Sequence, residues 1–206
     1  MRFIVVRHAQ SEWNERGLLQ GQRESGVSAR GLAQNEALLD ALEGYRIDAV
    51  LSSPATRALS TAHAVAQHHA APLRIDSRLH EQHLGEFQGM MIQDVLRLHP
   101  QSGGALLAGD IDAVPAQGES ARQAGERLYH ALLDYAQALP GETACAVTHG
   151  NTLAALLWRL HGAKLADPFS RYSPVNGSFS LIEVHNGELS VLSWGHATHL
   201  LAAGCL

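Results

Sequence analysis

Short apolar segments and amphipathic segments alternate along most of this 206-residue chain, and this alternation constrains its fold more than any other feature. Four short segments have strand-like patterns, at residues 3–6, 48–51, 73–76 and 143–147. Helical patterns occupy residues 30–43, 53–71, 90–98, 120–139 and 151–161. Buried strands that alternate with helices predict an α/β fold with a largely parallel sheet.

Local signals predict where some of these helices begin. Ser53 and Pro54 indicate a helix start, because Ser can cap a helix and Pro at the first helical position loses no needed donor. Ser120 with Gln123 forms a capping-box pattern ahead of the helix that runs to about residue 139. Residues 100–118 are rich in Gly and Pro, so we expect a loop there, which could serve as a mobile lid.

A β-hairpin is predicted near the C-terminus. Asn186-Gly187 is a strong two-residue turn signal between strand-like segments at 179–184 and 189–192. We therefore expect a hairpin added to the otherwise parallel sheet. The chain length fits one domain, residues 1–206, with a lid-like insertion near 88–118.

Composition excludes several classes of function. The hydrophobic share of 46% and the charged share of 17% suit a soluble globular protein. The net charge of -5 argues against general nucleic-acid binding through a basic surface. No apolar run reaches the ~20 residues of a membrane span. Two cysteines do not suggest a disulfide framework, so the cytoplasm is the simplest location, and a homodimer stays open.

Polar side chains follow four predicted strands at the point where each strand ends. They are Arg7 and His8, Arg57, Glu81 and His149. In open α/β sheets ligands bind beyond the carboxyl ends of the strands, so we expect these five residues to share one site. A cation beside an imidazole suits an anionic, phosphate-like ligand. Each residue alone has an ordinary structural explanation, but their coincidence at four strand ends favours a site.

A metal site is the alternative that thirteen histidines raise. Zinc sites favour His residues at i and i+4 with an acidic neighbour. His63 and His68 do not have this spacing, and His196 and His199 have no carboxylate or cysteine nearby. We therefore expect no metal and no other cofactor.

Taken together, these segments resemble the histidine phosphatase superfamily, also called phosphoglycerate-mutase-like. The matching segments are residues 7–14, 51–58, 79–89 and 147–150, with further landmarks at Gly118-Glu119-Ser120 and His199-Leu200. The resemblance covers nearly the whole chain. It implies a three-layer sandwich with a mostly parallel central sheet flanked by helices. It also implies hydrolysis of a small phosphomonoester through a phosphohistidine intermediate.

The resemblance implies catalytic roles for three residues. His8 would attack the phosphoryl group as a neutral imidazole. Glu81 would protonate the leaving oxygen and then deprotonate the attacking water, with Glu86 as the rival acid. His149 would be protonated and would donate to the phosphoryl oxygens.

Further residues would hold the phosphoryl group. They are Arg7, Arg57, Asn14, Gln20 and Gly150. The two guanidinium groups would clamp the nonbridging oxygens, which gather charge in the transition state. The helix expected after His149 would add free backbone N–H groups for the anion.

Two departures from the family pattern and two alternative functions remain. Ala9 stands where the family usually has Gly, and its Cβ could crowd the phosphate or exclude a positive φ. Residues 24–28 differ from the usual Asp-x-x-Leu-Thr stretch.

Gln82 follows Glu81 where family mutases carry Arg, which favours a phosphatase over a phosphoglycerate-type phosphomutase. A non-catalytic phospho-ligand binder is the other alternative. The physiological substrate is not readable.

Overall fold

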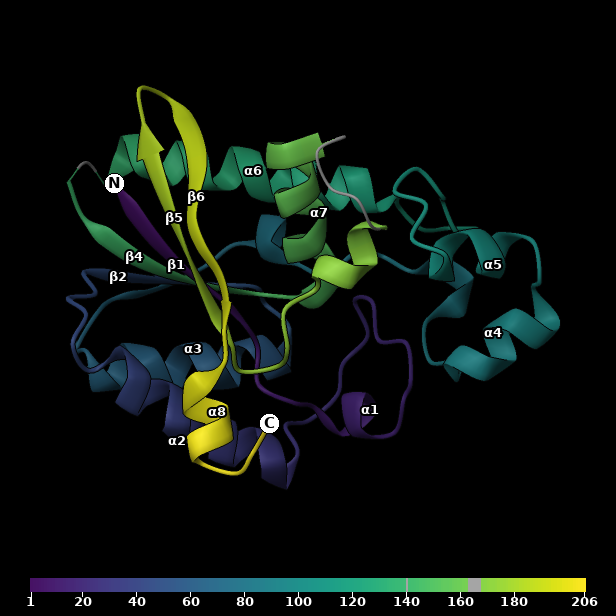
Figure 1. The fold of residues 1–206 in the computed structure, drawn as a ribbon, viewed down its shortest axis with the longest axis horizontal. Coiled ribbons are helices and arrows are strands. Elements are labelled where there is room, and N and C mark those ends of the chain that lie inside the picture. The colour runs from purple at the N-terminus through teal and green to yellow at the C-terminus, as the bar shows by residue number, and fades with distance from the viewer. Residues whose placement is uncertain (140, 163–167) are drawn as a thin grey trace.

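A mixed six-stranded sheet forms the centre of the described part of the chain (Figure 1). The computed structural model describes residues 1–139, 141–162 and 168–206. The strands are β1 (Arg2–Arg7), β2 (Ala49–Ser52), β3 (Leu73–Ile75), β4 (Thr143–Thr148), β5 (Phe179–His185) and β6 (Glu188–His196). Their order is β3-β2-β4-β1-β5-β6, with β1 to β4 parallel and β5 and β6 antiparallel. The predicted parallel sheet with a late hairpin is confirmed.

Helices cover both faces of this sheet (Figure 1). One face carries α6 (Ala121–Ala138) and α7 (Gly150–His161), and the other carries α2 (Ala29–Leu42) and α3 (Thr56–His68). The short helix α8 (Thr198–Ala202) packs against α2. Three more short helices lie in the connections, namely α1 (Glu12–Glu15), α4 (Ile92–Leu98) and α5 (Ser102–Leu107). Single 3₁₀ turns are η1 (Ser77–Leu79), η2 (Gly85–Phe87) and η4 (Phe169–Tyr172).

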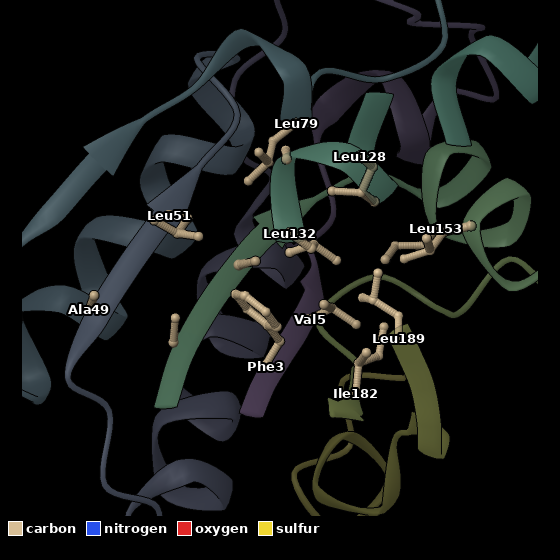
Figure 2. Close-up of a cluster of buried hydrophobic side chains, with 14 of the residues drawn as sticks. Phe3, Val5, Ala49, Leu51, Leu79, Leu128, Leu132, Leu153, Ile182 and Leu189 are labelled. Carbon is tan, nitrogen blue, oxygen red and sulfur yellow. The ribbon is translucent and has the colours of Figure 1, made fainter. Parts of the chain in front are cut away.

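The central strand β1 shows how the sequence produces two cores. Side chains alternate across a strand, so Phe3 and Val5 point to one face and Ile4 and Val6 to the other. Phe3 and Val5 pack against leucines of α6 and α7 (Figure 2). Ile4 and Val6 pack against α2 and α3. A strand that is apolar at every position therefore ends up in the middle of a three-layer sandwich.

Two of the local predictions are confirmed in atomic detail. The Ser120 side chain accepts from the backbone N–H of Gln123, and the Gln123 side chain returns the bond to the backbone of Ser120. Asn186 and Gly187 adopt φ values of 52° and 79°. Two positive φ values in succession are what a two-residue hairpin turn of type I′ requires.

The predicted helix start at Ser53 is wrong. Helix α3 begins at Thr56 with Ala55 at the N-cap, and no side chain of that cap bonds to the helix. Instead Glu24 Oε2 accepts from the backbone N–H of Thr56 at 2.8 Å. Arg57 is therefore the second residue of the helix rather than one turn into it. The Ser53 hydroxyl is engaged elsewhere, as the candidate site shows.

The predicted loop at residues 100–118 is also partly wrong, because it contains α5. Gly103 lies inside this helix, so close to Val95 of α4 that a Cβ atom would sit 2.4 Å from a Val95 methyl carbon. Gly103 thus permits a close approach of α5 to α4. The two helices lie away from the sheet on a small cluster of Leu84, Phe87, Val95 and Leu106. Within the described ranges, every helix is too short or too polar to cross a bilayer.

Candidate active site

A cavity of about 210 Å³ opens at the carboxyl ends of the parallel strands. Its polar lining is Arg7, His8, Asn14, Gln20, Arg57, Glu81 and Asn151. Its remaining lining is Gly17, Gly21, Leu18, Leu19, Leu84 and Ile92. Four of the five residues expected from the strand ends thus share one cavity. The fifth, His149, stands beside it, with its ring centroid 5.0 Å from that of His8.

The ring of His8 is held in one tautomer. The residue follows β1 directly and is 2% exposed. Its Nδ1 lies 2.7 Å from the carbonyl oxygen of Ala9. Because a carbonyl only accepts, Nδ1 carries the proton and Nε2 keeps its lone pair. Arg57 Nε donates to that Nε2 at 3.3 Å. The arrangement presents an unprotonated nitrogen to the cavity.

The electrostatics of the site keep this imidazole neutral. Burial lowers the pKa of His8 well below 6.5, and the nearby charges of Arg57 and Arg7 lower it further. A neutral imidazole is a nucleophile at pH values where an exposed histidine is already partly protonated. The structure therefore supports the expected protonation state of His8.

Arg57 is completely buried. Its Nη2 donates to the Gly21 carbonyl at 2.7 Å and its Nη1 to the Arg23 carbonyl at 2.9 Å. Within residues 1–139, 141–162 and 168–206, no salt bridge involves Arg57 or Arg7. A buried cation without a paired anion is costly, and a bound anion would remove that cost.

Arg7 is oriented by a segment that the sequence reading missed. Its Nη1 donates to Ser173 Oγ at 3.2 Å and to the Pro174 carbonyl at 2.7 Å. In the same segment, Asn176 Nδ2 donates to the His8 carbonyl at 2.9 Å. This stretch follows η4 and carries no motif, so only the folded chain reveals its role.

Glu81 is held by the first turn of α7. Its Oε1 accepts from the backbone N–H and hydroxyl of Thr152 at 3.0 and 2.9 Å, and from the Gln82 N–H at 2.9 Å. Its Oε2 accepts from the Asn151 N–H at 3.2 Å. The rival Glu86 is exposed and does not line the cavity. The geometry therefore favours Glu81 as the acid.

These contacts correct one expectation about the start of α7. The N–H groups of Asn151 and Thr152 were expected to be free for the phosphate, but Glu81 already occupies them. Gly150 instead packs against Arg7. A Cβ on Gly150 would lie 3.0 Å from Arg7 Cζ and 2.6 Å from Ser173 Oγ. The glycine therefore allows the guanidinium to approach the helix.

His149 is fully buried at the N-cap of α7. Its Nε2 lies 2.8 Å from Ser53 Oγ, and its Nδ1 has no partner among the described residues. Burial and the neighbouring Arg57 lower its pKa well below 6.5. Burial therefore disfavours the protonated form of His149 that the resemblance implies, and favours the neutral ring.

Asn14 and Gln20, the two amide residues predicted to hold the phosphoryl group, are both hydrogen-bonded to Ser11. Asn14 accepts from the Ser11 N–H at 3.2 Å and closes a capping box at α1. Gln20 Oε1 accepts from the Ser11 hydroxyl at 2.8 Å. Both side chains line the cavity, as their predicted role requires.

Ala9 fits its position without backbone strain, and its side chain is buried. It is buried, is not among the described residues with positive φ, and its N–H donates to Thr61 Oγ1 at 3.1 Å. The concern that a Cβ at this position would exclude a positive φ is thereby removed. Across the described part of the chain, no three His, Cys, Asp or Glu side chains gather as metal ligands would.

Comparison with known proteins matches residues 3–197 to a family model for the histidine phosphatase superfamily, branch 1. A metal-independent phosphoserine phosphatase of Arabidopsis thaliana is 32% identical over 99% of this chain and 85% of its own length. A glucosyl-3-phosphoglycerate phosphatase of Mycolicibacterium vanbaalenii is 35% identical over 78% of this chain and 74% of its own length. Relatives named as phosphoglycerate mutases match too, one from Brucella anthropi at 31% identity over 78% of this chain and 81% of its own length.

A solved structure has the same fold. Bacillus stearothermophilus YhfR superposes with a TM-score of 0.87 at 26% identity, over 97% of this chain and 98% of its own. The sequence and structural comparisons therefore point to one family over nearly the whole chain.

Proposed function

The chain belongs to the histidine phosphatase superfamily and is a phosphoric monoester hydrolase, and we propose that it works through a phosphohistidine formed on His8. The observation that carries this proposal is the pairing of Arg57 with His8. Because Arg57 donates to His8 Nε2, its guanidinium lies directly in front of the nucleophilic lone pair. A phosphoryl group that approached this nitrogen would be stabilised by the same cation.

In the first step, His8 Nε2 attacks phosphorus and forms an N–P bond while the P–O bond to the alcohol breaks. Arg7 and Arg57 hold the nonbridging oxygens as their charge increases. The Glu81 carboxyl group gives its proton to the departing oxygen, so the alcohol leaves neutral. Neutral His149 donates one hydrogen bond to the phosphoryl group through Nδ1, which has no hydrogen-bond partner among the described residues.

In the second step, water attacks phosphorus as the N–P bond breaks. Glu81, now a carboxylate, takes the proton of this water. Inorganic phosphate leaves and His8 returns to its neutral form. The bonds from Thr152, Asn151 and Gln82 hold the carboxylate in place through both steps.

The phosphoenzyme is the decisive observable. A radiolabelled aryl phosphate, quenched in base during turnover, should leave label on the wild-type protein, because phosphoramidates survive base and hydrolyse in acid. His8→Asn should abolish both label and turnover, whereas His99→Asn, which alters a half-buried histidine outside the cavity, should change neither. Undiminished turnover by His8→Asn would refute the nucleophile.

The acid is tested by a matched pair of variants. With an alkyl phosphate, whose leaving group needs a proton, Glu81→Gln should lower kcat about 10²- to 10⁴-fold. Glu86→Gln should have no such effect, because Glu86 lies outside the cavity. The reverse result would move the acid to Glu86.

A phosphoglycerate-type mutase is the second candidate, because relatives with that name match this chain. Gln82 after Glu81 is completely buried and donates to the Glu119 carbonyl at 3.0 Å, so it offers no cation to a second anionic group. Incubation with a phosphoglycerate should therefore yield free phosphate and no isomer. A non-catalytic binder would yield neither product.

We also propose that α4 and α5 act as a lid over the cavity, since Ile92 at the start of α4 lines it. A cytoplasmic location and a homodimer stay predictions.

A further inference from the structure

We propose that the alcohol part of the substrate is uncharged and largely apolar, about the size of a single ring. This inference rests on the proposed phosphatase function and names its substrate class. It conflicts with the carboxylate-bearing substrate that the name of one relative states, phosphoserine. Three features of the cavity carry it, namely its apolar wall, its charge and its size.

One part of the cavity lining is apolar. It is formed by Leu18, Leu19, Leu84 and Ile92, and the polar side chains of Asn14, Gln20 and Asn151 complete the lining beside the catalytic groups. Leu84 is 3% exposed and belongs to the small cluster that also contains Val95 of α4 and Leu106 of α5. Ile92 is 46% exposed although it is a large apolar side chain. An apolar leaving group would cover part of this exposed surface.

The charge of the cavity opposes a second anionic group. Arg7 and Arg57 are the cations that line it, and both lie at the phosphate end beside His8. Glu81 adds a carboxylate to the same lining. A carboxylate on the alcohol would meet no third cation in this lining, and Glu81 would repel it once the acid has given up its proton.

Two arginines outside the lining, Arg127 and Arg23, contact other groups. Arg127 donates to the Glu119 carboxylate at 2.8 Å and to the Glu81 carbonyl at 2.8 Å, so it supports the segment behind Glu81. Arg23 is exposed and does not line the cavity. Its guanidinium lies against Gly89, where an added Cβ would be 3.3 Å from Nη1.

The volume of the cavity suits a small alcohol. The cavity of about 210 Å³ is smaller than the roughly 300 Å³ at which pockets for larger ligands begin, and it must also hold the phosphoryl group. One ring or a short alkyl chain fits this space. A bulky sugar conjugate would extend past Ile92 into solvent.

Two nearly isosteric substrates test the charge directly. We expect kcat/KM for 4-carbamoylphenyl phosphate to exceed that for 4-carboxyphenyl phosphate at least about tenfold, because they differ mainly in one negative charge. Equal rates for the two aryl phosphates, or a preference for the carboxylate, would overturn the inference.

A pair of variants on one helix locates the effect. Ile92→Arg adds a cation at the cavity wall and should reduce the preference for the amide to about threefold or less. Leu96→Arg adds the same charge on α4 at a residue that is 48% exposed and outside the lining. It should leave the preference unchanged. An equal effect of both variants would show that overall charge, and not the cavity wall, selects the substrate.

The same two aryl phosphates distinguish a wrong substrate class from a wrong enzymatic function. Hydrolysis of both aryl phosphates at the wrong ratio would refute only the substrate class. No hydrolysis of either ester by the wild-type protein would refute both proposals.

Discussion

Ser53 is the residue whose role differs most from its predicted one. It was expected to cap α3, but its Oγ lies 2.8 Å from His149 Nε2 and accepts from the Ala55 N–H at 3.3 Å. His80 Nδ1 lies 3.5 Å from the same oxygen. If a phosphoryl oxygen is the missing partner of His149 Nδ1, that nitrogen must carry the proton, and Ser53 then donates to Nε2. Ser53 would thus select the tautomer of His149.

Removing the Ser53 hydroxyl should therefore affect catalysis more than binding. We expect Ser53→Ala to lower kcat about tenfold, the equivalent of one hydrogen bond, with KM changed less than about twofold. Ser53→Thr, which keeps the hydroxyl, should restore most of the rate. Ser52→Ala is the matched control, because Ser52 is equally buried but donates to the Ser53 carbonyl.

Nitrogen NMR of the protein with bound vanadate provides a readout that a purely structural role would not change. The wild type should show His149 protonated at Nδ1, and Ser53→Ala should show a mixture of tautomers. A single Nδ1-protonated form in Ser53→Ala would mean that Ser53 does not set the tautomer.

The site residues fall into two groups according to how they could be found from the sequence. Arg7, His8 and Glu81 follow strand-like segments, so the strand-end rule for α/β sheets places them without any contact being known. Ser173 and Asn176 lie in an irregular segment between η4 and β5. Their roles depend on how that segment folds over β1, and no local pattern encodes such a contact.

At the level of elements, the first turn of α7 organises the two ends of the site. The N–H groups of Asn151 and Thr152 fix Glu81, while Gly150 gives room to Arg7. One helix terminus thus positions the acid and one arm of the phosphate clamp. Because the orphan N–H groups of a helix start need acceptors, the Glu81 carboxylate also serves as the cap that His149 does not provide.

Gly150→Ala should disturb this turn and lower activity. The added Cβ would lie 3.0 Å from Arg7 Cζ and 2.6 Å from Ser173 Oγ, so the guanidinium must move. We expect kcat/KM to fall at least about a hundredfold, within the range for a displaced charge in phosphoryl transfer. Gly104→Ala is the control, since a Cβ on this helical glycine of α5 meets nothing within 4 Å. Steady-state kinetics on an aryl phosphate measure both, and wild-type activity of Gly150→Ala would contradict the packing argument.

The elements themselves show which sequence signals are reliable. Ser120 and Ser53 both precede helices, yet only Ser120 acts as the cap. Ser120 has its capping-box partner Gln123 within the same turn, so local sequence is enough to predict the bond. The Ser53 hydroxyl instead contacts His149, which lies 96 residues away in the sequence. Tertiary contacts of this kind override local propensity.

For the molecule as a whole, the apolar pattern predicts the sheet and its two cores. Residues of β1 alternate between the two cores, and the hairpin turn at Asn186 and Gly187 adds β5 and β6 at one edge. The α4–α5 region was not predicted in full, because its small cluster around Val95 lies outside those cores. Short helices that pack on a few side chains leave a weak periodic signal.

The buried imidazoles also make the stability of the whole molecule depend on pH. The pKa values of His8 and His149 are well below 6.5 in the folded protein, mainly because burial disfavours their charged forms. In the unfolded chain both should titrate near 6.5. Below about pH 6.5 the unfolded state therefore binds more protons, so the free energy of unfolding should fall as pH decreases and level off above that value.

Urea unfolding between pH 7.5 and 5.0 measures this dependence. Each of the two groups should contribute up to about 1.4 kcal/mol per pH unit to the decline below pH 6.5. His149→Asn removes one of them, so the free energy of unfolding should decline less steeply with falling pH. His63→Asn, at an exposed position of α3, should keep the wild-type slope. Equal slopes for His149→Asn and the wild type would mean that the folded site accepts a proton on His149, and the neutral ring inferred from its burial would be wrong.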